Sequence, residues 1–434
     1  MDWKSVYAQK IKKGEEAVKA VQPGDGVYIG TTSSMAYVLI DELWKRRREL
    51  SDITINSTSL LRSCDFTYGD GEYSYRMNSC FCGKGERQAI KSGILDFTSV
   101  HLSQVDIWCK QTAKPSVCFF DVSLPDENGY MSYGPSGIGL NNYFIGNVRN
   151  VVVQVNKQTP YVYGESNLIH VSQVDAIVEV DELTDILDVP EIDDETGKLS
   201  QFIIEQIPDG ATIQLGLGKL STAIGLSLDK KNDLGVHSEM MNDSIMYLMN
   251  NGNITNAGKG FLNGKSVFAF ALGSEDLYKF INYNEKVYGA PYPFVNNPVN
   301  ISKNKRMISI NTAMAIDLFG QVAADSIGWK QQSGTGGQLD FVRGAQMSEE
   351  GKSFIAATSS FIKDGHRISR IVVNLPVGTA VTTPRSDVQY VATEYGCVNL
   401  KVLNMSDRVR AMISLAHPDF RNQLTDEAKK YNLI

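Results

Sequence analysis

Long hydrophobic runs are missing from this sequence of 434 residues. No stretch approaches the roughly 18 apolar residues that a membrane-spanning helix needs. The first residues, MDWKSVYAQKIKKGEE, contain no apolar segment of the kind found in secretory signals. The six cysteines are too few, in a chain of this length, to indicate a disulfide framework. We therefore expect a protein without a membrane span or a secretory signal, located in the reducing cytoplasm.

An excess of positive charge is also missing. Lysine and arginine number 42 against 49 aspartates and glutamates, which gives a net charge of -7, and no basic block or stripe occurs. A protein that binds nucleic acid or an anionic membrane is therefore not expected. An anionic small-molecule substrate stays open, because local charge and backbone N–H groups are enough to bind one.

Two familiar kinds of catalytic site lack their signatures. The chain has only five scattered histidines, and no histidine or cysteine cluster has metal-ligand spacing, since Cys80-Phe81-Cys82 lacks partners. A Gly-x-Ser-x-Gly elbow is also missing, which disfavours a Ser-His-Asp hydrolase. The sequence predicts no metal site.

The composition is that of a globular enzyme, with 42% hydrophobic and 21% charged residues. The length exceeds the usual limit for one hydrophobic core, so at least two domains are expected. Apolar, nearly continuous strands alternate with helices along the chain. This alternation predicts an α/β fold with two open, mostly parallel sheets that are covered on both faces.

The pattern places strands and helices as follows. Strands are expected at 27–29, 53–57, 117–122, 151–155, 175–181, 211–215, 234–238, 266–272, 306–311, 353–358, 368–373 and 389–393. Helices are expected at 2–12, 14–20, 34–48, 199–206, 220–230, 243–250 and about 406–416, the last of them ending the helical part of the chain before His417-Pro418.

The segment Leu183 to Lys198 is acidic and contains proline, which indicates a linker between domains, or alternatively a surface loop within one domain. The linker interpretation gives domains at 1–185 and 186–434. Residues 22–39 and 207–226 share the order turn, strand, glycine-containing loop, helix. This faint repeat favours two similar α/β domains, with the active site between them at the carboxyl ends of strands.

A glycine-containing turn joins a strand to a helix in the segment Gln214-Leu215-Gly216-Leu217-Gly218-Lys219-Leu220. Glycines there let backbone N–H groups approach an anion or a developing oxyanion, and the helix N-terminus adds partial positive charge. The spacing is not that of a Walker loop, because Leu220 follows Lys219 where serine or threonine is required. A tight turn without a ligand is the alternative interpretation.

Glu239 lies one strand further on, in the segment GVHSEMMND, at the expected carboxyl end of a strand. A carboxylate in that position can serve as a nucleophile or a general base. The alternative is a solvated glutamate, with Asn242 or Asp243 as the N-cap of the next helix. We interpret the neighbouring His237 as a packing residue rather than a base.

A second glycine-rich loop occurs in the segment SIGWKQQSGTGGQLDFVRGA at 326–345 and opens another apparent helix. Gly334, Gly336 and Gly337 are too many for a simple turn, so a loop that holds a phosphate or a substrate is favoured. Arg343 is either a substrate clamp or part of a structural salt bridge. The carboxylate of Glu394, in TEYG, is interpreted as structural.

Five ordered motifs carry a resemblance to a known family: QLGLG, GVHSEM, SIGWKQQSGTGGQLDFVRGA, AVTTPRSDVQYVATEYG and AHPDF. Together they resemble the acetyl-CoA hydrolase/transferase family, and within it the 4-hydroxybutyrate CoA-transferases and the butyryl-CoA:acetate CoA-transferases. The likeness runs over nearly the whole chain and is denser from residue 200 onward. It implies an enzyme that moves coenzyme A between a short-chain acyl-CoA and a carboxylic acid such as acetate.

The resemblance implies that Glu239 is the catalytic carboxylate, which attacks the thioester and then carries coenzyme A as a glutamyl thioester. It places coenzyme A, as a substrate and not a permanently bound cofactor, against two glycine loops. It also implies a homodimer or a larger homo-oligomer, whereas the absence of a nucleic-acid or membrane partner is expected from the charge and the lack of long apolar runs. The implied coenzyme A contacts are Gly216, Leu217, Gly218, Lys219, Leu220, Met314, Gly336, Gly337 and Phe361.

The chain departs from the family at one loop, where relatives usually read GIGxxP and this sequence has Gly218-Lys219-Leu220-Ser221. Lys219 either meets a phosphate of coenzyme A or is simply exposed. Three rival functions remain: a short-chain acyl-CoA hydrolase on the same scaffold, a non-catalytic CoA-binding protein, and a nucleotide-dependent acid–CoA ligase. The presence of Glu239 with both glycine loops disfavours the second, and the lack of a Walker loop disfavours the third.

Overall fold

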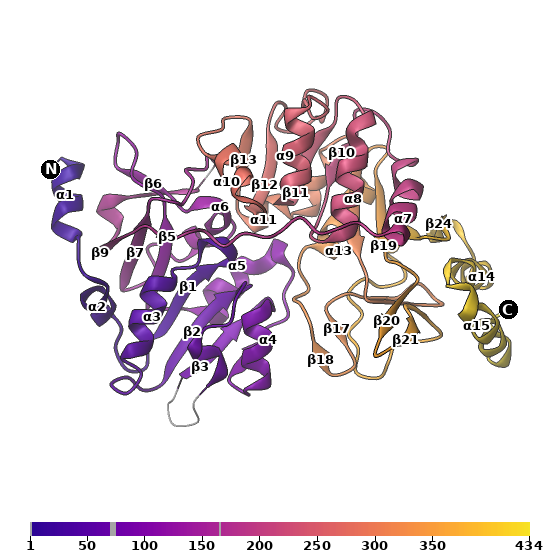
Figure 1. The fold of residues 1–434 in the computed structure, drawn as a ribbon, viewed down its shortest axis with the longest axis horizontal. Coiled ribbons are helices and arrows are strands. Elements are labelled where there is room, and N and C mark those ends of the chain that lie inside the picture. Colours follow the sequence, from indigo (N-terminus) through magenta and orange to yellow (C-terminus); the bar gives the residue numbers. More distant parts are fainter. Residues whose placement is uncertain (1, 70–74, 165) are drawn as a thin grey trace. The chain divides into compact units, whose positions relative to one another are not determined.

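The computed structural model describes residues 2–69, 75–164 and 166–434. These residues form two compact units. Unit 1 contains Met1–Asp188 and Val267–Phe294, and unit 2 contains Val189–Ser266 and Val295–Ile434. Each unit contains a mostly parallel sheet with helices, so the predicted α/β fold class is confirmed (Figure 1). Compact units need not be independently folding domains, and the domain bounds 1–185 and 186–434 stay a prediction.

Seven parallel strands form the sheet of unit 1 among the described residues, in the order β4-β3-β2-β1-β5-β7-β9. Every residue of β5 is buried, which explains why all of its residues except Asp121 are apolar. The strands are β1 Gly26–Thr31, β2 Ile53–Thr58, β3 Tyr75–Ser79, β4 Leu95–Phe97, β5 Val117–Val122, β7 Asn150–Asn156 and β9 Ala176–Val180.

Helices and short strands complete unit 1. The helices are α1 Trp3–Lys10, α2 Gly14–Ala17, α3 Tyr37–Lys45, α4 Lys84–Lys91, α5 Val105–Trp108, α6 Gly134–Gly137 and α10 Glu275–Ile281. The further strands are β6 Tyr130–Ser132 and β8 Leu168–His170, which pair with each other, and β12 Ser266–Ala271 and β13 Val287–Gly289. Helix α11 Tyr292–Val295 lies where the chain passes into unit 2.

Six neighbouring strands lie within unit 2, in the order β11-β10-β14-β19-β23-β24. All adjacent pairs are parallel except the last, because β24 returns beside β23 as a hairpin. These strands are β10 Thr212–Gln214, β11 Gly235–Met241, β14 Met307–Thr312, β19 Lys352–Ala356, β23 Tyr390–Thr393 and β24 Gly396–Asn399.

Unit 2 also has helices and several very short strands, of which β17, β18, β20 and β21 gather below helix α13 in the view of Figure 1. The helices are α7 Asp194–Ile204, α8 Lys219–Ser227, α9 Asp243–Asn250, α12 Pro298–Ser302, α13 Gln338–Met347, α14 Met405–Leu415 and α15 Pro418–Lys430. The short strands are β15 Ala315–Asp317, β16 Val322–Ala323, β17 Ser326–Ile327, β18 Lys330–Gln331, β20 Ser360–Lys363, β21 His366–Ser369 and β22 Ile371–Val372.

Three expectations about elements are wrong, for local reasons. Helix α7 begins inside the expected linker, because Asp193 caps it by accepting a hydrogen bond from the Thr196 N–H at 2.9 Å. Helix α15 follows α14, since Pro418 occupies the first turn of a helix, where proline is favoured, rather than ending one. The strand expected at 368–373 is divided between β21 and β22.

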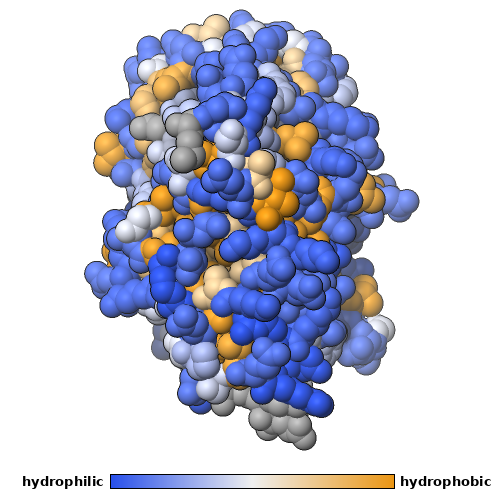
Figure 2. Space-filling view, turned by 90° about the vertical axis from the view of Figure 1, so that its left-hand side faces the viewer, coloured by the Kyte–Doolittle hydropathy of each residue, from blue (hydrophilic) through white to orange (hydrophobic). Residues whose placement is uncertain are grey.

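None of the described helices is long and apolar enough to cross a membrane. Hydrophilic residues cover most of the face shown in Figure 2, and apolar residues form smaller groups among them. Of the described cysteines, all six are free thiols and four of them are buried.

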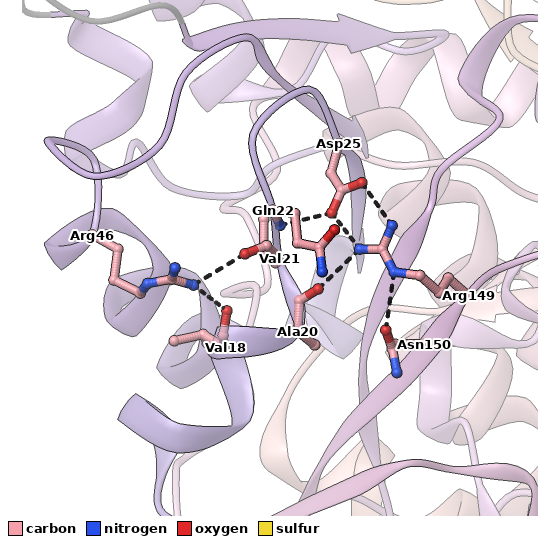
Figure 3. Close-up of polar contacts among 8 residues, drawn as sticks. All are labelled: Val18, Ala20, Val21, Gln22, Asp25, Arg46, Arg149 and Asn150. Carbon is pink, nitrogen blue, oxygen red and sulfur yellow. Dashed lines mark hydrogen bonds and ion pairs between the residues drawn. The ribbon is translucent and has the colours of Figure 1, made fainter.

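An ion pair fastens the turn before β1 to the start of β7 (Figure 3). The Arg149 guanidinium donates to both carboxylate oxygens of Asp25, at 3.1 and 2.5 Å, and to the carbonyl oxygen of Ala20 at 3.0 Å. Burial alone would raise the pKa of Asp25, but hydrogen bonds from Arg149 and from the Gln22 N–H outweigh it and lower the pKa below its usual value. The ionised pair therefore stabilises the fold.

We expect Arg149→Met to lower the free energy of unfolding by about 1–2 kcal/mol, because it leaves the buried Asp25 carboxylate without its charged donor while Arg149 itself is partly solvated. Urea denaturation followed by circular dichroism measures the change. Lys45→Met is the control: it removes an exposed pair with Glu42 at 2.6 Å, which solvent screens, and should change the stability much less. Because the pKa of Asp25 is lowered by folding, the difference for Arg149→Met should shrink as the pH falls through that pKa. Equal losses in the two variants at neutral pH would contradict the interpretation.

Candidate active site

Glu239 lies in strand β11, beyond the carboxyl end of the neighbouring strand β10. The two strands pair at Thr212–Gly235 and Ile213–Val236, and β10 ends at Gln214 while β11 continues to Met241. The side chain of Glu239 is therefore at the edge of the parallel sheet where α/β proteins usually place their chemistry. The expected strand at 234–238 was too short, since Glu239 belongs to the strand itself.

The Glu239 carboxylate is partly buried and has two identified donors. The side-chain amide of Asn296 donates to Oε2 of Glu239 at 2.7 Å, and the backbone N–H of Gly337 also donates to the carboxylate. Gly337 is the N-cap of helix α13, so the positive end of a helix faces the negative side chain. Asn296 is fully buried and lies 57 residues after Glu239 in the sequence.

The electrostatics around Glu239 favour partial protonation near neutral pH. The pKa of Glu239 is raised to about 7, mainly by burial and in addition by the nearby carboxylate of Asp340. The hydrogen bonds from Asn296 and Gly337 act in the opposite direction, because they stabilise the ionised form. A desolvated carboxylate with a pKa near 7 is a stronger nucleophile than a solvated one and is still ionised in part at neutral pH.

The first glycine loop is bound to strand β11 on both sides of Glu239. The Ser238 hydroxyl donates to the carbonyl oxygen of Leu215 at 3.1 Å, and the Asn242 amide donates to the carbonyl oxygen of Gly216 at 3.2 Å. Asn242 also caps α9 by accepting a hydrogen bond from the Ile245 N–H. The sequence had indicated Asn242 or Asp243 as the cap of this helix. The structure therefore brings the 215–220 loop beside Glu239.

Within this loop the predicted residues differ in exposure. Gly218 is the N-cap of α8 with a φ of 93°, a conformation that favours glycine, and Leu220 is buried. Leu217 is 47% exposed. Lys219 is exposed and forms an ion pair with Asp193 at 3.1 Å.

The second glycine loop supplies the tightest packing in the site. A Cβ atom added to Gly337 would overlap both the Asn296 amide nitrogen and Oε2 of Glu239. The preceding residue, Gly336, is buried and has a φ of 63°. Glycine at 337 is therefore required by the close approach of the backbone to the carboxylate, which the glycine-rich pattern alone did not specify.

Met314 and Phe361 both contact the side chain of Arg370. The Arg370 guanidinium lies 4.6 Å from the centre of the Phe361 ring and donates to the carbonyl oxygen of Met314 at 3.2 Å. Both residues are partly buried. They form a second group in unit 2, contributed by the segment after β14 and by β20.

Three further side chains have structural roles. Arg343 makes two hydrogen bonds to the Asp387 carboxylate at 2.9 and 3.2 Å, so it belongs to a salt bridge, the second of its two predicted alternatives. Glu394 accepts hydrogen bonds from Ser359, in agreement with its structural interpretation. His237 is buried and packs inside the unit, and burial lowers its pKa to about 3, so it is not a base.

Asn296 and Asp340 are the site residues that the sequence did not reveal. Asn296 lies in YPFVNNPVN, a segment without a recognised motif, and no local pattern indicates its contact with β11. Asp340 follows the second glycine loop, in QLD, where an acidic residue is common in the first turn of any helix. Among the described residues, no three histidine, cysteine, aspartate or glutamate side chains are grouped as metal ligands.

Family models match both ends of the chain. Residues 1–188 match the acetyl-CoA hydrolase/transferase N-terminal domain, and residues 273–428 match the acetyl-CoA hydrolase/transferase C-terminal domain. The chain belongs to the acetyl-CoA hydrolase/transferase family, which confirms the resemblance seen in its motifs.

Relatives and solved structures agree with this membership over the full length. A 4-hydroxybutyrate coenzyme A transferase from Clostridium kluyveri is 38% identical, over 99% of this chain and 100% of the relative. A butyryl-CoA:acetate CoA-transferase from Anaerostipes caccae is 36% identical, over 99% and 98%. The crystal structure of 4-hydroxybutyrate CoA-transferase from Porphyromonas gingivalis matches with a TM-score of 0.81 and 32% identity, over 99% and 100%.

The named hydrolases are more distant. An acetyl-CoA hydrolase from Yarrowia lipolytica is 24% identical, over 79% of this chain and 72% of the relative. The prediction that the chain is an enzyme of the CoA-transferase type is therefore confirmed at the level of the class.

We expect Gly337→Ala to lower kcat for CoA transfer by about 100-fold or more, because the added methyl group displaces either the Glu239 carboxylate or its Asn296 donor. Initial-rate kinetics measure the loss, and circular dichroism verifies the fold. Gly258→Ala is the matched control, since a Cβ at Gly258 meets no atom within 4 Å and the same methyl group is added to the same unit. Comparable rates for Gly337→Ala and wild type would show that the close packing has no catalytic consequence.

Proposed function

We propose that this protein transfers coenzyme A between a short-chain acyl-CoA, 4-hydroxybutyryl-CoA or butyryl-CoA, and a carboxylic acid such as acetate. The observation that carries the proposal is the carboxylate of Glu239, held between the Asn296 amide and the N-terminus of α13 beside a glycine loop. The names of the full-length relatives support the short acyl groups and acetate.

The proposed reaction begins with attack of a Glu239 carboxylate oxygen on the thioester carbonyl of the acyl-CoA. The carbon–sulfur bond breaks, CoA leaves as the thiolate, and a mixed anhydride joins Glu239 to the acyl group. The thiolate then attacks the Glu239 carbonyl of that anhydride, which forms a glutamyl-CoA thioester and releases the first acid. An incoming carboxylate reverses these steps and leaves as the new acyl-CoA.

A carboxylate nucleophile suits this reaction for an energetic reason. An anhydride and a thioester are both activated acyl derivatives, so the free energy of the original thioester is retained through each step. A serine nucleophile would form an ordinary ester and lose that free energy. No metal ion or external energy source is needed for the exchange.

Backbone N–H groups of the 216–220 loop are proposed to hold the thioester oxygen as negative charge develops on it, because the N-terminus of α8 begins there. The remaining proposed contacts to coenzyme A are Gly336 and Gly337, with Met314 and Phe361 near Arg370. We also propose a homo-oligomer in the cytoplasm, with domains at 1–185 and 186–434, on the basis of the family resemblance and the composition.

Mass spectrometry of the protein incubated with butyryl-CoA, without an acceptor acid and then with borohydride, tests the proposal. We expect a CoA adduct, or its reduction product, on the peptide that contains Glu239, and loss of the adduct when acetate is added. Glu239→Gln should form no adduct and lose at least about 10⁴-fold in rate, as expected when a nucleophile is removed. Glu205→Gln, on the exposed end of α7, is the control and should behave as wild type. Steady release of CoA without an adduct would indicate a hydrolase instead.

The pH dependence follows from the raised pKa of Glu239. Only the ionised carboxylate attacks, so kcat/KM should fall about tenfold per pH unit below pH 7 and reach a plateau above it. Asn296→Ala removes a donor to the ionised form and should move this acidic limb toward alkaline pH by about one unit. Initial rates between about pH 5.5 and about pH 9, on both sides of the expected pKa near 7, measure both profiles. A wild-type profile that stays flat down to pH 5.5 would contradict the assignment of Glu239 as nucleophile.

A further inference from the structure

His237 and Glu239 point to the same face of strand β11, because side chains two residues apart share a face, while Ser238 points to the other. On that face, Nε2 of His237 lies 2.8 Å from the carbonyl oxygen of Val295. The next residue, Asn296, donates its amide to Glu239 at 2.7 Å. Two adjacent hydrogen bonds therefore join β11 to the short segment before α12.

The hydrogen bond fixes the protonation state of His237. The Val295 carbonyl oxygen can only accept, so Nε2 of His237 carries the proton. The other ring nitrogen, Nδ1, is buried and has no partner among the described residues, as expected for an unprotonated nitrogen in a neutral ring. Burial and the ammonium group of Lys259 lower the pKa of His237 to about 3, so the ring stays a neutral donor at physiological pH.

The surroundings of the two side chains come from separate elements. The ring of His237 lies beside Phe261, with centres 6.1 Å apart, and Phe341 of α13, 6.3 Å apart. Lys259 is the titratable group near His237, and its Nζ donates to the carbonyl oxygens of Val236 and Lys265 at 2.7 and 2.9 Å. Burial lowers the pKa of Lys259 to about 7. Glu239 itself faces Asn296, the Gly337 N–H and the carboxylate of Asp340.

The amide of Asn296 needs a firmly placed backbone to act on Glu239. Its Oδ1 atom is buried without a hydrogen-bond partner among the described residues, so the bond to Glu239 and the backbone position determine where the amide lies. The Val295 carbonyl, which His237 holds, belongs to the peptide unit that leads directly into Asn296. A change at His237 is thereby transmitted to the donor of the catalytic carboxylate.

We infer that His237 is a positioning residue, whose Nε2–H bond to Val295 sets the place of the Asn296 amide against the Glu239 carboxylate. The inference rests on the proposed function, since it assigns Glu239 as the nucleophile. It gives the histidine of the GVHSEM motif a role other than packing or proton transfer.

The pH profile of kcat/KM tests this role, because a purely structural residue would not move the acidic limb. His237→Leu keeps an apolar side chain but removes the donor, and should move the limb toward alkaline pH by about one unit, as Asn296→Ala does. His237→Asn, whose amide is too short to reach Val295, should give the same shift and serves if His237→Leu does not fold. His237→Gln, whose amide nitrogen can occupy the place of Nε2, should restore the wild-type limb.

A double variant tests whether His237 acts on Glu239 through Asn296 or independently of Asn296. His237→Leu combined with Asn296→Ala should shift the limb no further than Asn296→Ala alone, since both changes remove the same hydrogen bond to Glu239. Phe261→Leu is the matched packing control, because it alters the apolar contact of His237 without removing its hydrogen bond, and it should leave the limb in place.

The outcomes distinguish this inference from the proposed function. Active His237→Leu and His237→Asn variants with an unmoved limb, or additive shifts in the double variant, would overturn the role of His237 and leave the proposed function standing. A wild-type protein that forms no adduct at Glu239 and transfers no CoA would overturn both.

Discussion

The Glu239 carboxylate must be desolvated enough to react and still be ionised, and the rest of the site depends on this requirement. Burial and Asp340 raise its pKa, whereas the Asn296 amide and the N–H at the start of α13 lower it. With burial and Asp340 alone, the side chain would stay protonated. With the two hydrogen-bond donors alone, the carboxylate would be a weak nucleophile. The opposing groups set its pKa near 7.

Strand β11 organises these groups through three consecutive residues. His237 bonds to Val295 beside the Asn296 donor, Ser238 bonds to Leu215 in the first glycine loop, and Glu239 projects from the same face as His237 and accepts from Asn296. Because side chains alternate along a strand, one tripeptide can hold two separate segments in place. Glycine at position 337 then lets the N-terminus of α13 approach the carboxylate, where any side chain would overlap it.

The sequence predicted what short patterns encode. Mostly apolar runs such as 117–122 matched β5, and motifs indicated the glycine loops and Glu239 as candidates for the site. Asn296 was missed because its partner is 57 residues away, and no local pattern reports a contact at that distance. The start of helix α7 was misplaced because acidic residues at its first turn, which favour a helix N-terminus, resemble a charged linker. Capping geometry and long-range packing therefore account for the errors, whereas apolar runs and short motifs account for the successes.

The central claim is that a Glu239 oxygen takes part in the bonds that are made and broken. Tracing oxygen-18 from doubly labelled acetate, with butyryl-CoA in ordinary water, tests it most directly. When acetate attacks the glutamyl-CoA thioester and CoA then takes up the acetyl group, one labelled oxygen stays on Glu239. The account predicts that mass spectrometry finds this label on the peptide containing Glu239 after turnover. Acetyl-CoA formation with an unlabelled Glu239 peptide would contradict it.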